Sequence, residues 1–444
     1  MLIDFRIKNY KSFIEEGDFS MLAAPKQQGL NYSLYEKQIN SVKLKMLSTS
    51  VVYGPNASGK TNLIGAMDTL RSIILRGHIK NDDEKESPNT AATNLELIPN
   101  VSFSDPEPVE FFIDFLEKNL RIQYKLKLDL GVFLDEDYKR KVIFEQLTVN
   151  GKTIFTRSDK LDIGDIPTIK KYLGESIISN IDGAKQIAIG SLNEEELFLT
   201  NGFKLIYSSK LANLIIHWFA SKFMVIYRAD SVSFIKRFSD PKKKTIYVEK
   251  TTNTAAKMFG INSNAIGYVF DDDENEAKLC SLFSDKQNSG GVSAISAEIF
   301  ESFGTLRFIN LFPLVIRAIQ TGSTLVIDEF DASIHPMALM NIINIFHNDD
   351  INVNHAQLIF NTHNPIFLNS NLFRRDEIKF IEREEDNHNS IIYSLSDFGT
   401  SGANGVRMNE DYMKNYFISR YGAIRDIDFS PIFEDIIKSS VGEE

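Results

Sequence analysis

The sequence lacks the features of exported and membrane proteins. It has a single cysteine, Cys280, among 444 residues, which excludes an intrachain disulfide and any cysteine-rich zinc site. No apolar run approaches the roughly 18 residues that a membrane helix needs. The N-terminal segment carries an acid at Asp4 and has no apolar stretch typical of a secretory signal peptide. We therefore expect a cytoplasmic protein.

Positive charge is also in deficit. The chain has 49 Lys and Arg against 60 Asp and Glu, a formal charge of −11, which excludes a uniformly basic nucleic-acid surface. A local basic run remains at Ile235–Lys244, "IKRFSDPKKK", which is either a contact for DNA or a solvated hairpin tip. The acidic run Asp271–Glu276 is expected to be a solvated loop or the start of a helix.

The apolar pattern predicts an α/β fold. No internal repeat or low-complexity tract is visible, and the length suffices for two or three structural units. Strands alternate with helices, which indicates a largely parallel sheet. The expected strands are Leu47–Tyr53, Thr324–Ile327 and Gln357–Phe360, with a hairpin over Val109–Leu130; the expected helices are Asn62–Leu75, Lys210–Phe223, Phe300–Gln320 and Met337–Phe346.

The most specific motif is "GPNASGKT", Gly54 to Thr61, which matches G-x-x-x-x-G-K-[ST] between a predicted strand and a predicted helix. Its glycines let backbone N–H groups surround phosphates, and the helix N-terminus adds partial positive charge. Lys60 is expected on the β and γ phosphates of ATP, and the Thr61 hydroxyl on Mg²⁺. The alternative is a glycine-rich turn with an exposed lysine. The predicted nucleotide contacts are Gly54, Asn56, Ser58, Gly59, Lys60, Thr61 and Asn62.

Acidic and histidine residues follow two later strands. In "TLVIDEFD", Asp328 ends an apolar strand, where it suits the support of Mg²⁺, and the adjacent Glu329 is expected to polarise the attacking water. His363, in "NTHNP", follows the next strand, and ligands of open α/β sheets bind at that edge. We therefore expect Lys60, Glu329 and His363 to be catalytic and His363 to sense the γ-phosphate.

Five motifs in order carry a resemblance to the ABC-type ATPases of the SMC/RecF clade. They are "FRIKNYKSF", "GPNASGKT", "ESFGT", "LVIDEFDASIHP" and "FNTHNP". The resemblance implies a mixed sheet with a P-loop core, an antiparallel β arm and a mainly helical insertion. It implies nucleotide-binding lobes over residues 1–150 and 288–444, with the insertion, an oligomer or partner contact, over 151–287. Lys11 corresponds to a segment that contacts nucleotide in relatives.

In that clade two ATP molecules lie between two protomers, and each contacts a signature motif of the partner protomer. Two segments compete for this role. Ser289-Gly290-Gly291 is closer in letters to the usual L-S-G-G-Q, whereas Ser302, Gly304 and Thr305 open the helix that leads into the acidic strand. We assign the signature to the second segment, because a helix N-terminus there would face a γ-phosphate. Asp331 and Ser333 correspond to the D-loop at the dimer seam.

The chain resembles the clade's stand-alone members. It has no sustained heptads that would form a long coiled coil, and few residues follow His363 for an appended Toprim domain. Three C-terminal segments, "FRRDEIKFIERE", "SIIYSLSDFG" and "SRYGAI", resemble ATPases of bacterial anti-phage defence, the abortive-infection AbiL type and the AriA subunit of PARIS. This resemblance implies a homodimer or higher homo-oligomer, a separately encoded nuclease or toxin effector, DNA or a phage protein as trigger, and no membrane. A RecF-like DNA-repair clamp and a nucleotide-gated scaffold with little turnover are the alternatives.

Overall fold

The computed structural model describes most of the chain. The description covers residues 1–444 except 26, 28, 41, 81–94, 136, 175–180, 191, 228–245, 271–276, 285–291, 401–404, 408–409, 426 and 442–444. The basic run at 235–244, the acidic run at 271–276 and the tripeptide Ser289–Gly291 therefore lie outside the described residues.

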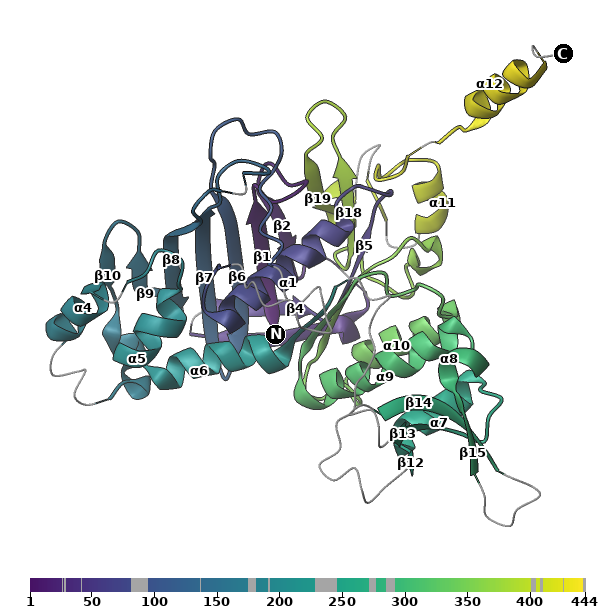
Figure 1. Ribbon diagram of the computed structural model, residues 1–444, viewed down its shortest axis with the longest axis horizontal. Coiled ribbons are helices and arrows are strands. Elements are labelled where there is room, and N and C mark those ends of the chain that lie inside the picture. The colour runs from purple at the N-terminus through teal and green to yellow at the C-terminus, as the bar shows by residue number, and fades with distance from the viewer. Residues whose placement is uncertain are drawn as a thin grey trace.

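A six-stranded sheet occupies the centre of the molecule (Figure 1). Its first five strands are parallel, so their carboxyl ends meet at one edge, and only the last strand is antiparallel. The predicted strand Thr324–Ile327 is confirmed to the residue. In order across the sheet the strands are β11 (Phe223–Ile226), β16 (Thr324–Ile327), β17 (Gln357–Asn361), β5 (Thr49–Tyr53), β18 (Ile378–Arg383) and β19 (Ser390–Ser394).

Helices cover both faces of this sheet. Because successive side chains of a strand point to opposite faces, Val326 packs into one core while Leu325 and Ile327 pack into another. Helix α1 (Lys60–Arg76) lines the first core, and α9 (Phe303–Thr321) and α10 (Pro336–His347) line the second. The helices predicted from Asn62, Phe300 and Met337 are thereby confirmed, with ends shifted by one to three residues.

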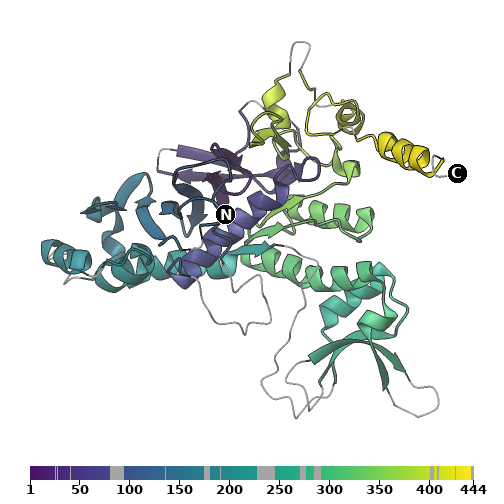
Figure 2. The same cartoon turned by 45° about the horizontal axis from the view of Figure 1, so that its top comes forward.

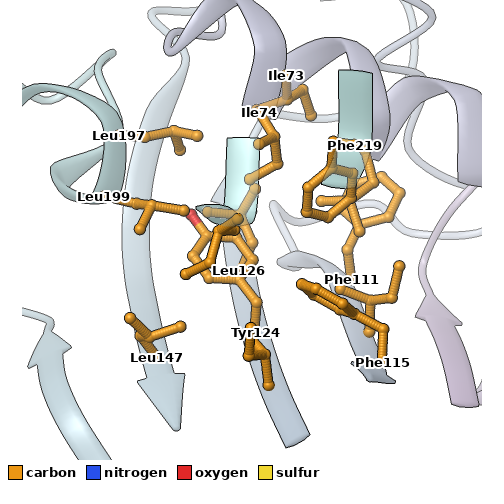
Figure 3. Packing of buried hydrophobic residues seen from close by; sticks show 14 of the residues in the cluster. Ile73, Ile74, Phe111, Phe115, Tyr124, Leu126, Leu147, Leu197, Leu199 and Phe219 are labelled. Carbon is orange, nitrogen blue, oxygen red and sulfur yellow. The ribbon is translucent and has the colours of Figure 1, made fainter. Parts of the chain in front are cut away.

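An antiparallel sheet of seven strands forms the predicted β arm. It packs against α1, and Phe111, Phe115 and Tyr124 of this sheet share one hydrophobic core with Ile73 and Ile74 of the helix (Figure 3). The Val109–Leu130 hairpin is confirmed. In order the strands are β10 (Leu161–Ile163), β9 (Lys152–Arg157), β8 (Lys141–Val149), β7 (Leu120–Asp129), β6 (Val109–Glu117), β1 (Leu2–Lys8) and β2 (Gly17–Ser20), with β3 (Leu34–Ile39) and β4 (Val42–Leu47) paired separately.

The stretch 151–287 does not fold as one separate insertion. The boundary at residue 150 lies in the tight β8–β9 turn, so the antiparallel sheet continues past it. Strand β11 of the same stretch belongs to the central sheet. The remainder contains the helices α4 (Ile181–Gly190), α5 (Lys204–Ile206), α6 (Ser209–His217) and α7 (Lys250–Phe259) and the strands β12 (Ile246–Tyr247), β13 (Ala265–Phe270) and β14 (Ala277–Ser284). These strands form a four-stranded sheet with β15 (Val292–Ser296), which lies beyond the predicted boundary at residue 287.

The buried helix predicted over Lys210–Phe223 is only partly correct. Helix α6 ends at His217, a π-helical turn spans Trp218–Lys222, and Phe223 already begins β11. Trp218 stacks between Phe115 and Phe223, with ring centroids 3.9 Å and 5.0 Å away. The wider turn places two neighbouring aromatic rings, Trp218 and Phe219, in the core together.

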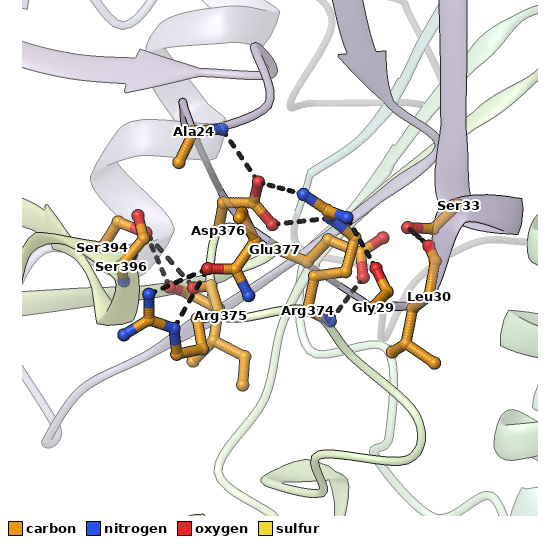
Figure 4. A network of polar contacts seen from close by, with 12 residues as sticks. Ala24, Gly29, Leu30, Ser33, Arg374, Arg375, Asp376, Glu377, Ser394 and Ser396 are labelled. Atoms are coloured by element: carbon orange, nitrogen blue, oxygen red, sulfur yellow. Dashed lines mark hydrogen bonds and ion pairs between the residues drawn. The ribbon is translucent and has the colours of Figure 1, made fainter. Parts of the chain in front are cut away.

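The C-terminal region begins against the central sheet and ends away from it. Helix α11 (Tyr412–Phe417) packs into the second core through Tyr412 and Tyr416, whereas α12 (Ser430–Val441) projects outward in both views (Figures 1 and 2). The short helix α8 (Ala297–Phe300), which precedes α9, packs on β14 and β15. A buried network before β18 joins the C-terminal region to the N-terminal part of the chain. Arg374 pairs with Asp376 at 2.8 Å and donates to the Gly29 carbonyl at 2.7 Å (Figure 4).

Candidate nucleotide site

The glycine-rich loop joins the end of β5 to α1 and requires glycine at two positions. A Cβ on Gly54 would lie 2.2 Å from the Ile381 carbonyl oxygen. Gly59 caps α1 with a φ of 112°, and a Cβ there would meet the hydroxyl of Ser390 at 2.5 Å. Both contacts come from β18 and β19, so the neighbouring hairpin holds the loop against the helix N-terminus.

Lys60 is buried at the first position of α1. Its ammonium donates to the carbonyl oxygens of Gly54 at 2.8 Å and Pro55 at 2.9 Å, which keeps it beneath the loop. Burial lowers the pKa of Lys60 to about 8, and Asp328, Glu329 and Asp331 oppose that shift. Three acids that the sequence assigned to the site therefore lie within electrostatic reach of this ammonium.

Thr61 meets the acidic strand end directly. Its hydroxyl donates to Asp328 Oδ1 at 3.3 Å, although the two residues are far apart in sequence. Asp328 is also held by Asn361, whose Nδ2 donates to the same oxygen at 2.5 Å. Asn361 was not among the predicted site residues. Its position at the carboxyl end of the strand before His363 is the sequence feature from which it could have been predicted.

The backbone of Glu329 is fixed, while its side chain is exposed. Glu329 has a φ of 51°, its N–H donates to Asn361 Oδ1, and its carbonyl accepts from Arg307 Nη2. A non-glycine residue in the left-handed region persists only where neighbours determine its conformation. Glu329 lines the same cavity as Lys60 and His363.

His363 follows β17 and lines that cavity as predicted. Desolvation of the ring lowers the pKa of His363, and the Lys60 charge acts in the same direction, whereas Asp331 and Asp328 oppose it. The neutral imidazole is therefore favoured at neutral pH, and it offers one hydrogen-bond donor and one acceptor.

One cavity of about 580 Å³ collects these groups, a volume within the usual range of small-molecule sites. Predicted residues account for part of its wall: Lys11, Asn56, Ser58, Gly59, Lys60, Thr61, Asn62, Glu329 and His363. Ser12, which also lines the cavity, belongs with Lys11 to the segment expected to contact nucleotide. Sequence reasoning missed the rest. The missed residues are Ala57, Ile98, Pro99, Asn100, Val101, Ser102, Phe133, Arg383, Asn387 and His388.

Lys11 lies in the cavity wall, but its ammonium has a protein partner. It pairs with Glu96 and donates to the Tyr227 hydroxyl at 3.3 Å. Its neighbour Ser12 accepts from Asn62 Nδ2 at 2.8 Å, which ties the N-terminal segment to the first turn of α1. A contact of Lys11 with nucleotide therefore stays a prediction.

The predicted signature segment caps α9 next to the D-loop. Ser302 Oγ accepts from the Thr305 N–H at 3.2 Å, and a Cβ on Gly304 would lie 2.1 Å from the Ser333 carbonyl oxygen. Ser302, Gly304 and Thr305 do not line the cavity around Lys60. Their contact with a nucleotide requires a second chain and stays a prediction.

The pair Thr61 and Asp328 fits Mg²⁺ together with phosphate oxygens and water, the oxygen ligands that this ion prefers. In the described part of the chain, no group of three or more His, Cys, Asp and Glu residues forms a metal-holding cluster. The residues present thus suit an ion that shares its coordination with a nucleotide.

The parallel core, the glycine-rich loop and the converging acids define a P-loop domain of the ATPase class. The family model described as "AAA domain, putative AbiEii toxin, Type IV TA system" matches residues 50–369, and the chain belongs to that family. Among solved structures it is similar to the SMC head domain from Thermotoga maritima, at 13% identity and a TM-score of 0.35, over 88% of this chain and 98% of that chain. The comparison with curated proteins gives no match. Within the described residues, no helix has the length and apolarity to cross a membrane.

Proposed function

We propose that the chain binds and hydrolyses ATP with Mg²⁺. The observation that carries the proposal is the convergence of groups from three segments at the carboxyl edge of one sheet. The glycine-rich loop supplies Lys60 and Thr61, the end of β16 supplies Asp328 and Glu329, and the end of β17 supplies His363. Phosphoryl transfer depends mainly on positioning and charge neutralisation, and these side chains provide both.

Each residue has a definite role in the proposal. Lys60 exchanges its carbonyl partners for β and γ phosphate oxygens, and Thr61 and Asp328 hold the metal. Mg²⁺, when bound, neutralises phosphate charge. Glu329 polarises the attacking water and His363 donates to the γ-phosphate. Asn361 is a positioning residue, because it bonds both the Asp328 carboxylate and the Glu329 main chain.

The ATPase proposal is tested with Lys60→Ala. Removing the ammonium should abolish measurable ATP binding and hydrolysis, since no other buried cation of the cavity occupies its place under the loop. Equilibrium binding of labelled ATP is the measurement. Lys139→Ala, an exposed lysine paired with Glu194, is the matched control and should bind normally. Tight ATP binding by Lys60→Ala would show that the phosphate loop is misassigned.

The biological role proposed is control of a separately encoded effector in anti-phage defence, through a homo-oligomer in which the nucleotide lies between two chains. The family description, with its putative toxin, and the resemblance to stand-alone defence ATPases support this role. Co-purification of the product of the adjacent gene, released or activated on exposure to phage, is the test. Salt-dependent binding of duplex DNA by the isolated chain would favour the DNA-repair clamp instead.

A further inference from the structure

The cavity has two chemically different ends. The part of the wall formed by the glycine-rich loop, Glu329 and His363 carries N–H groups, charges and Thr61, whose hydroxyl bonds Asp328, and it suits phosphates and Mg²⁺. The other end contains the segment 98–102, Phe133 and the turn between β18 and β19. None of the five sequence motifs includes these residues.

The second end combines flat apolar surface with polar groups at its rim. Ile98, Pro99 and Val101 contribute aliphatic surface, and the Phe133 ring is 37% exposed. Arg383 at the end of β18, and Asn387 and His388 in the turn that follows, contribute groups that donate or accept hydrogen bonds. A heteroaromatic ring needs this combination, because its faces stack while its edges form hydrogen bonds.

The β18–β19 turn is anchored to the glycine-rich loop. Ser390 Oγ donates to the Ser58 carbonyl at 2.6 Å, and the Ser390 N–H donates to the Ser12 carbonyl at 2.8 Å. Next to it, Asn389 Oδ1 accepts from the Ile14 N–H at 2.9 Å. The turn therefore keeps a fixed position beside the phosphate loop.

Contacts within the turn fix the residues that line the cavity. Arg383 Nε donates to the His388 carbonyl at 2.9 Å, and the Asn389 N–H donates to Asn387 Oδ1 at 2.7 Å. His388 takes a φ of 59°, in the left-handed region. A turn that is already ordered loses less conformational entropy when it receives a ligand, so its contacts contribute more to affinity.

We propose that Phe133 and the β18–β19 turn form the subsite for the base and ribose of a purine nucleoside triphosphate. The inference rests on the proposed function, since the triphosphate must occupy the loop for the base to reach this end. Phe133 stacks on the base, and Arg383 and His388 contact the base edge or the ribose. Because stacking scales with ring area, purine nucleotides bind more tightly than pyrimidine nucleotides.

The test compares ATP with inorganic tripolyphosphate, which has phosphates but no base. Phe133→Ala should weaken ATP binding about tenfold and leave tripolyphosphate binding unchanged, because stacking on an aromatic ring is lost. His388→Ala should act in the same direction, and Phe133→Tyr should restore ATP affinity. The matched controls are Leu134→Ala, which is 77% exposed beside Phe133, and Asp386→Ala in the turn; neither residue lines the cavity.

The outcomes separate the subsite from the proposed function. Unchanged ATP affinity in Phe133→Ala and His388→Ala overturns the subsite, and so does an equal loss for ATP and tripolyphosphate, which would indicate a structural role. In both cases the assignment of the phosphate loop would stand if the wild-type protein binds tripolyphosphate and the Lys60→Ala variant does not. Wild-type protein that binds neither ligand overturns both proposals. Thermal unfolding of each variant confirms that it is folded.

Discussion

Asn361 is the residue that organises the acidic side of the site. Its amide nitrogen donates to Asp328 and its amide oxygen accepts from the Glu329 N–H, so one side chain fixes two neighbouring acids. Glu329 lines the cavity, whereas Asp328 does not. The acid proposed for Mg²⁺ and the acid proposed for water are thus distinguished by their hydrogen bonds, although they are adjacent in sequence.

Glu329→Gln should keep ATP binding and slow hydrolysis about 100-fold, because the carboxylate that polarises water is lost while Lys60, Thr61 and Asp328 remain. The amide has nearly the same shape, so the left-handed backbone at this residue should be retained. Single-turnover hydrolysis and ATP affinity are measured together, with Glu298→Gln in α8 as the control. Wild-type turnover in Glu329→Gln would mean that the water is activated elsewhere.

The pH dependence of nucleotide affinity should report Lys60. Burial lowers its pKa to about 8 from 10.5, so the ammonium loses its proton in the folded chain at lower pH than in the unfolded chain. Bound phosphates favour the charged form, and affinity should therefore fall as pH rises above about 8. The unfolded chain binds more protons between these two values, so Lys60 adds to the free energy of unfolding as pH rises through that window.

Calorimetry at pH 9 in two buffers with different ionisation enthalpies measures this effect. Nucleotide binding there should take up close to one proton, whereas binding at pH 7 should take up almost none from Lys60. An affinity that stays constant from pH 7 to 9.5 would show that the lysine remains charged throughout this range.

Among the elements, the connection before β18 holds the C-terminal part of the sheet to the N-terminal segment. Arg374 and Asp376 are each about 1% exposed, and Asp376 also accepts from the Ala24 N–H at 2.8 Å (Figure 4). The adjacent Arg375 donates to the carbonyl oxygens of Gly399 and Val406. The "FRRDE" stretch is therefore structural in this chain.

Arg374→Ala should lower the free energy of unfolding by about 3 kcal/mol, because it leaves the Asp376 carboxylate buried without its cation. Urea denaturation is the measurement. Arg317→Ala on the exposed side of α9 is the control and should change stability by less than about 0.5 kcal/mol. If Arg374→Ala lowers the free energy of unfolding by no more than the control does, water or a rearranged neighbour replaces the guanidinium.

The elements predicted well are those with strong local signals. Thr324–Ile327 is a short apolar run of β-branched and aliphatic residues, and the helix after the glycine-rich loop starts where the motif requires it. The four-stranded sheet β12–β15 was missed because its outer strands give little signal. β12 has only two residues, and β15 reads "VSAIS" with its first four residues exposed. The π-helical turn at Trp218 depends on tertiary aromatic packing, which no local pattern encodes.

The candidate site likewise contains residues that the sequence predicted and residues that it did not. Motif residues such as Lys60, Thr61 and Asp328 were found because their chemistry demands those residue types at fixed spacing. Phe133, Val101 and His388 could not be found, since each lies in a loop without a motif. Only pairing of β1 with β6 and of β18 with β5 brings their segments to the cavity.

At the scale of the whole molecule, the signature segment and the Lys60 cavity occupy different places on one chain. The N-terminus of α9 packs on the D-loop through Gly304 and does not contribute to the cavity wall. Gly304→Glu is thus a poor probe of partner contacts, since any side chain there would displace the Ser333 backbone. Phe303 is the better position, because it is 56% exposed at the first residue of α9.

Phe303→Glu should preserve folding and ATP binding by a single chain while blocking hydrolysis. A carboxylate in the first turn of a helix is favourable for the helix itself, whereas it would repel the γ-phosphate held by a partner chain. Gly290→Glu, in the rival tripeptide, should hydrolyse ATP normally. Normal turnover by Phe303→Glu together with loss of turnover by Gly290→Glu would transfer the signature to Ser289–Gly291.

Mixing two inactive chains tests whether each site is shared between protomers. A Phe303→Glu chain retains Lys60, and a Lys60→Ala chain retains its signature, so their heterodimer contains one site in which both contributions are intact and one in which both are damaged. Hydrolysis should therefore appear on mixing and rise to about half the wild-type rate per heterodimer if the two sites turn over independently. The control is Phe303→Glu mixed with the double variant Phe303→Glu, Lys60→Ala, in which no intact site exists. ATP hydrolysis in the first mixture alone would require the nucleotide to bridge two chains. No hydrolysis in either mixture, with dimers confirmed by light scattering, would contradict the shared site.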